Sequence, residues 1–88
     1  MHKYLAEFLG TLFFIYVILA TKSALAIGLA LAVAIMILGP YSGGNFNPAV
    51  SVVMTVAKKL PQSDLLPYVM AQVAGGLVAI EAHKRIKF

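Results

Sequence analysis

The sequence predicts an all-α membrane protein with three transmembrane helices and one half-length helix that enters the membrane from one side. Two observations support this prediction. The 88 residues are 61% hydrophobic and only 11% charged, with a mean hydropathy of +0.92, which is more apolar surface than a soluble domain of this length can bury. The apolar residues also fall into stretches of helical length that are separated by charged, glycine-containing or proline-containing segments.

Three of these apolar stretches are long enough to cross a bilayer. They cover about residues 4–21, 24–38 and 65–81. At a rise of 1.5 Å per residue, these helices span roughly 22–27 Å, close to the ~30 Å hydrocarbon core. We therefore expect an integral, multi-pass membrane protein whose surroundings are lipid.

The segment between the second and third stretches, residues 39–57, predicts a re-entrant loop followed by a short helix. Pro40 lacks a backbone donor, and Gly43 and Gly44 favour backbone angles that other residues avoid. The proline and the two glycines therefore oppose continuation of the helix. We therefore expect the chain to leave the second helix after Leu38.

A new helix is expected to begin at Asn47 and Pro48. Asparagine is a favoured N-cap, and proline suits the first helical position. The apolar run that follows stops at Lys58 and Lys59 after roughly 15 Å, which is half the thickness of a bilayer. A half-length apolar helix between two spans is typical of a re-entrant segment, with a short interfacial helix as the alternative.

The polar start of this half-helix predicts a pore or a pocket. Lysines at the membrane face would direct its N-terminus toward the midplane, where irregular backbone is tolerated only in a water-filled cavity or inside protein. The positive end of the helix dipole would then disfavour cations. The Asn47 side-chain oxygen can cap the helix while its NH2 donates to a solute. Acceptors along the same path would be the carbonyl groups of Gly43, Gly44, Asn45 and Phe46.

Composition excludes several other classes of protein. There is no cysteine, so disulfides, thiolate metal sites and cysteine nucleophiles are absent. The net charge of +4 comes from cations at the ends of apolar segments, so nucleic acid is not an expected partner. His2 and His83 are isolated near the two ends, and no metal site or cofactor is expected. The acidic residues fall in separate segments without a nucleophile and base pair, so no enzyme is expected.

Asn47-Pro48-Ala49, preceded by Ser42-Gly43-Gly44, resembles the signature loop of the aquaporin and glycerol-facilitator family, the major intrinsic proteins. The similarity extends to the three long stretches, through AEFLGT at residues 6–11, LAIGLA at 25–30, and Pro67-Tyr68, Ala71-Gln72 and Gly75-Gly76. It covers essentially the whole chain as a single aquaporin-type repeat, residues 1–88. The resemblance implies a passive channel for water or small neutral solutes.

The resemblance also implies roles for individual residues. Glu7 would be a buried carboxylate bonded to the backbone of the re-entrant loop, and Gln72 would brace the same loop from the third long helix. Gly28 and Gly75 would permit close helix crossings. The positions that match the family's pore constriction are Ile27, Ile35 and Val50. Valine stands where one family repeat carries arginine, so strict selectivity for water is not expected.

One repeat cannot enclose a pore, so the resemblance implies a second half in the inverted orientation. The flanking cations are nearly balanced between the two faces of the membrane, which gives little preference for either orientation. One face carries Lys3, Lys58 and Lys59; the other carries Lys22, Lys84, Arg85 and Lys87. We therefore expect an antiparallel homodimer, and the resemblance implies further clustering into a tetramer of pores.

Three alternatives to a self-paired channel stay open. The second half could be a separate complementary chain, or the protein could be a non-conducting subunit of a full-length channel. A proton-coupled exporter that uses Glu7 is the third, since an ionisable residue inside a span is a functional candidate. Flux that is independent of a proton gradient would distinguish the passive channel from the exporter.

Overall fold

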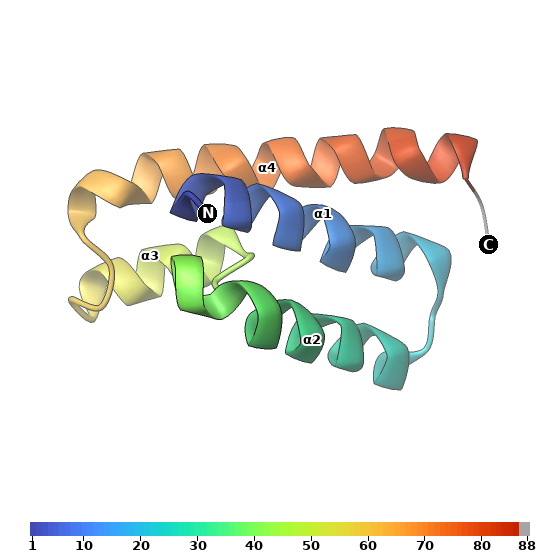
Figure 1. Cartoon of the computed structure of the whole chain (residues 1–88), viewed down its shortest axis with the longest axis horizontal. Coiled ribbons are helices and arrows are strands. Elements are labelled where there is room, and N and C mark those ends of the chain that lie inside the picture. The colour runs from blue at the N-terminus through green and yellow to red at the C-terminus, as the bar shows by residue number, and fades with distance from the viewer. Residues whose placement is uncertain (87–88) are drawn as a thin grey trace.

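The structure is a computed structural model that describes residues 1–86, and Lys87 and Phe88 lie outside the described residues. Four helices follow one another along the chain (Figure 1): α1 (Lys3–Ala20), α2 (Ala24–Ser42), α3 (Pro48–Val56) and α4 (Gln62–Arg85). Helices α1, α2 and α4 are long and apolar enough to cross a membrane, and residues 1–86 contain no strand. The predicted all-helical membrane fold is confirmed.

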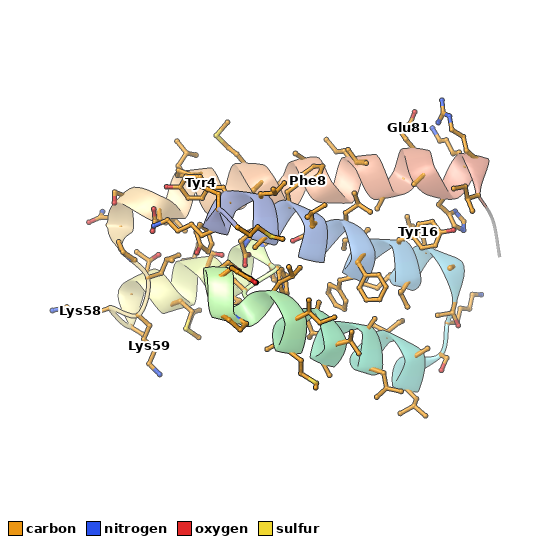
Figure 2. All side chains as sticks on the ribbon, viewed as in Figure 1. Tyr4, Phe8, Tyr16, Lys58, Lys59 and Glu81 are labelled. Carbon is orange, nitrogen blue, oxygen red and sulfur yellow. The ribbon has the colours of Figure 1, made fainter. Side chains whose placement is uncertain are left out.

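The three long helices lie side by side along the longest axis of a body that measures 38 × 23 × 23 Å. Helix α1 is central and packs against both α2 and α4, whereas α3 packs against α4. The turn between α3 and α4 lies at one end of the bundle, and the connection between α1 and α2 lies at the other (Figure 1). Lys58 and Lys59 are accordingly at the opposite end from Glu81 (Figure 2).

Helix α3 begins inside the bundle and runs outward to its end (Figure 1). Its nine residues rise roughly 14 Å, about half the hydrocarbon thickness. Residues 43–47 return the chain from the end of α2 to the start of this helix. The long helices and the short one together have the arrangement expected of three spans and a re-entrant half-helix.

The prediction that the second helix ends at Leu38 is wrong, because α2 continues through Pro40 to Ser42. Proline removes one backbone donor, but it does not prevent a final turn. That turn is closed by the Gly43 N–H, which donates to the Gly39 carbonyl over 2.7 Å. Gly43 has a φ of +87°, the left-handed conformation that commonly ends a helix.

Helix α4 is longer at both ends than the predicted 65–81. Asp64 does not delimit it, because its carboxylate is buried and accepts hydrogen bonds from Lys3 Nζ at 2.6 Å and Tyr4 Oη at 2.7 Å. An acidic residue in the first turn also suits the positive end of the helix dipole. The same contacts tie the start of α1 to the start of α4.

Small residues bring α1 and α4 into backbone contact. A Cβ atom added to Gly75 would lie 2.5 Å from the Phe8 carbonyl oxygen and 3.1 Å from the Leu12 nitrogen. Ala6 and Ala79 are both fully buried. Gly75 therefore sits at a close helix crossing, where any side chain would separate the two helices.

We predict that Gly75→Ala lowers the free energy of unfolding by about 1–3 kcal/mol, because overpacking against backbone forces the helices apart. Gly76→Ala is the matched control, since its added methyl would meet Ile15 at an ordinary 3.8 Å. Denaturation in mixed detergent micelles, followed by circular dichroism, measures both variants. Equal stability of the two variants would contradict the assigned crossing.

Candidate functional site

The carboxylate of Glu7 on α1 is fully buried and organises the re-entrant loop. One oxygen accepts the Phe46 N–H and Gln72 Nε2, each at 2.8 Å. The other accepts the Ser42 hydroxyl at 2.6 Å and the Asn45 N–H at 3.2 Å. The loop runs inside the bundle, so its donors need acceptors within the protein. Glu7 supplies these acceptors and joins α1 to the loop, α2 and α4.

Ser51 forms a second polar centre on the buried side of α3. Its hydroxyl oxygen accepts Gln72 Nε2 at 2.7 Å and Asn45 Nδ2 at 3.1 Å. Tyr68 lies one turn before Gln72 on α4 and donates its hydroxyl to the Ser42 carbonyl at 2.7 Å. These bonds fix the half-helix and both ends of the loop against α4.

Sequence reasoning missed three members of this network: Ser42, Ser51 and Tyr68. A signal existed for two of them. Ser51 interrupts the apolar half-helix, and a polar residue that faces lipid would be costly. Tyr68 is four residues before Gln72 and therefore lies on the same helix face. Ser42 could not be distinguished from an ordinary turn residue.

Asn47 caps α3. Its backbone is extended, and its Oδ1 accepts the Ala49 N–H at 2.8 Å. Pro48 occupies the first helical position, where its missing N–H costs no helical bond. Among residues 1–86, the Asn47 NH2 group has no hydrogen-bond partner, and the residue is exposed. A cap and a free donor are therefore both present at the inner end of the half-helix.

A hollow of about 480 Å³, here called the Asn47 hollow, opens beside this cap. Its lining residues come from α1, the loop, the start of α3 and α4: Thr11, Phe14, Ile15, Ile18, Phe46, Asn47, Pro48, Gln72, Val73 and Gly76. Most of this wall is apolar. A mostly apolar hollow with a few convergent polar groups is the usual form of a site for small molecules.

Two buried polar atoms of this wall have no partner within the described part of the chain. They are Thr11 Oγ1 and Gln72 Oε1, on residues that are 3% and 2% exposed. The two hydrogens of Gln72 Nε2 are directed to Glu7 and Ser51, so its oxygen remains as an acceptor. Buried polar groups are rarely left unpaired in proteins. These atoms therefore suit a water molecule, a solute or a partner's polar group.

Phe46 has a structural role beyond its predicted carbonyl. Its ring is buried against α1 at Gly10, where an added Cβ would lie only 2.1 Å from the ring. Its φ of +55° is uncommon for a residue other than glycine. The buried ring and the bond from its N–H to Glu7 hold this conformation.

The remaining predicted site residues are distributed differently. Ala49 is exposed, and the predicted constriction residues Ile27, Ile35 and Val50 are absent from the lining of the Asn47 hollow. Gly28 is exposed, and an added Cβ there would meet no atom within 4 Å. Within the chain, a close helix crossing is therefore found at Gly75. Gly28 instead lies on an open face of α2.

The sequence profile of the major intrinsic protein family matches residues 18–86. The chain belongs to the major intrinsic protein family. Its three long apolar helices are those of an integral membrane protein, and residues 1–86 hold no group of three or more His, Cys, Asp or Glu side chains that could bind a metal ion.

Curated members of this family resemble the chain over part of their own length. A glycerol uptake facilitator protein-like 6 of Lactiplantibacillus plantarum is 42% identical over 93 residues, covering 96% of this chain and 43% of that protein. Aquaporin Z of Brucella melitensis is 40% identical over 94 residues, covering 90% and 41%. The aquaglyceroporin AqpS of Rhizobium meliloti is 47% identical over 55 residues, covering 62% and 24%. The chain thus spans less than half the length of these major intrinsic proteins.

We predict that Glu7→Gln lowers the free energy of unfolding by about 2–4 kcal/mol. An amide has one acceptor oxygen, and its NH2 would face loop donors that then lack a partner. Glu81→Gln is the control, because Glu81 is exposed and its ion pairs within residues 1–86 are with Lys84 and Arg85 of its own helix. Detergent denaturation that gave both variants the same stability would remove Glu7 from its central place in the site.

Proposed function

We propose that the chain is half of a passive transmembrane channel for water or small neutral solutes, and that an inverted second copy completes the pore. The Asn47 hollow carries this proposal. It places a helix N-terminus, a free amide donor and two unpartnered polar atoms in one apolar wall, within a chain of the major intrinsic protein family.

The polar atoms of the hollow suit neutral solutes. Asn47 Nδ2 donates, Gln72 Oε1 accepts and the Thr11 hydroxyl can do either. Water and small alcohols or amides have an acceptor oxygen, so they can accept a hydrogen bond from the exposed Asn47 side chain as they pass. Phe14, Ile15 and Ile18 offer apolar surface alongside, which suits a solute that must leave again.

The positive end of α3 supports the exclusion of cations. The dipole of α3 places about half an elementary positive charge at its N-terminus, where Asn47 and Pro48 line the hollow. The Glu7 carboxylate on α1 is bonded to the loop, and its two oxygens accept hydrogen bonds from four donors. Its negative charge is therefore turned toward the loop backbone. This arrangement favours a passive channel over an exporter that loads protons on Glu7.

The open surfaces of the chain support pairing with a second half. Helix α2 packs only on α1 among the helices, and only 11% of its apolar window is buried. The small residues Ala24, Gly28 and Ala32 are all exposed on it. Their i, i+4 spacing would permit a close helix approach by another copy.

We predict that Asn47→Asp assembles but loses neutral-solute flux or acquires a cation leak. The carboxylate keeps the capping oxygen and is stabilised by the helix dipole. It loses the NH2 donor and cancels the positive end that repels cations. Swelling and proton-leak assays on proteoliposomes of the purified chain, with water and with glycerol, measure these effects.

Gln62→Glu is the control for that experiment, because it makes the same chemical change on an exposed side chain outside the Asn47 hollow. It should retain flux and cation exclusion. If Asn47→Asp assembled normally and kept both neutral-solute flux and cation exclusion, the channel proposal would be withdrawn.

A further inference from the structure

Two lysines at one end of the bundle lack acidic partners. The sequence contains three acidic side chains, and the structure accounts for each of them. Glu7 is enclosed by the loop, Asp64 pairs with Lys3, and Glu81 pairs with cations of its own helix. None of these carboxylates is left to pair with Lys58 or Lys59.

The lysines are also not required to satisfy the end of α3. Cationic side chains often bond the last carbonyls of a helix. Here backbone N–H groups do so instead: Lys59 and Leu60 donate to the Met54 carbonyl, Lys58 to Thr55 and Ala57 to Val53. Both lysines are exposed and their side chains extend from the end of the bundle (Figure 2).

A second hollow, here called the lysine hollow, adjoins these two residues. It measures about 560 Å³ and is lined by Thr55, Val56, Lys58, Lys59, Leu60, Pro61 and Gln62. The wall is amphipathic, because it combines Val56, which is 78% exposed, with the two lysines and Gln62. Such a wall complements a ligand that carries an anionic group next to an apolar portion.

We propose that the lysine hollow binds the phosphate headgroup of an anionic phospholipid. The turn lies at the end of the bundle where the spanning helices meet the membrane surface, and basic pockets at this depth recognise anionic headgroups. Lys58 and Lys59 bond the phosphate oxygens, and Gln62 donates to the glycerol or phosphate oxygens. Val56 contacts the first part of an acyl chain. A soluble phosphate would use the lysines alone and leave Val56 uncovered.

Lipid retention in detergent tests this site. The full-length chain is purified with dioleoylphosphatidylglycerol or with dioleoylphosphatidylcholine, which has the same tails and no net charge, and bound lipid is quantified by mass spectrometry. We expect preferential retention of the anionic lipid. Glycerol phosphate, which carries the headgroup chemistry without tails, should not displace it at equal concentration.

Lys58→Asn with Lys59→Gln should weaken this retention roughly 30-fold, since each lysine near an anionic surface contributes about a fivefold factor. Asparagine is chosen because Lys58 has a φ of +62°, which asparagine tolerates. Lys59→Gln alone, at a residue of ordinary backbone, should lose about fivefold and remains informative if the double variant fails to fold.

Lys84→Gln with Arg85→Gln is the matched control. It also removes two cations, but these pair with Glu81 at the opposite end, so it should retain the anionic lipid. Equal retention of both lipids by the native chain would overturn the proposal. The proposal would also be overturned if the control lost its preference for the anionic lipid as much as the lysine variants do. Displacement of the lipid by glycerol phosphate would overturn it too, because the site would then bind a soluble anion.

Discussion

One buried carboxylate, that of Glu7, accepts four hydrogen bonds and holds this fold together. A loop that enters the membrane interior carries backbone donors where neither water nor a regular ladder can satisfy them. Glu7 meets this requirement from α1, and its partners lie on α2, on the loop and on α4. These bonds hold the loop that leads into α3. They therefore fix where α3 lies and keep its N-terminus directed into the bundle.

The bonds of this network also determine which groups are left for a solute. Gln72 directs both amide hydrogens to Glu7 and Ser51, so its oxygen is left as a buried acceptor without a partner in residues 1–86. Asn47 uses its oxygen to cap α3, so its NH2 has no partner within the described residues. The groups that stabilise the loop and the groups available to a solute thus belong to the same side chains, and structural bracing and proposed transport are linked.

Much of the fold could be predicted from the sequence, because hydropathy and helix capping are local signals. Three long apolar stretches and the Asn47-Pro48 start of α3 required no knowledge of tertiary contacts. The predicted end of α2 was wrong because Pro40 does not stop the helix. The helix is instead closed by the hydrogen bond from the Gly43 N–H to the Gly39 carbonyl. That bond depends on a backbone conformation that residue type alone does not specify.

The site was less predictable, because its members meet only in three dimensions. Gly10 makes room for the ring of Phe46, which is 36 positions away in a different element, and no local pattern relates them. Phe14 was missed although it lies seven residues after Glu7 on the same face of α1, so helical spacing could have found it. The roles of Ile27, Ile35 and Val50 concern a mouth that a single chain does not enclose, and they remain predictions.

Pulsed electron paramagnetic resonance between copies can distinguish the proposed inverted pair, which forms one pore, from a parallel pair. Ser63 and Lys22 are both exposed and lie near opposite ends of the bundle, and the chain has no cysteine to interfere with labelling. In reconstituted mixtures of singly labelled chains, we expect an inverted pair to give a shorter distance between Ser63 of one copy and Lys22 of the other than between the two Ser63 labels. The reverse order would mean that the copies lie parallel, which excludes an inverted pair.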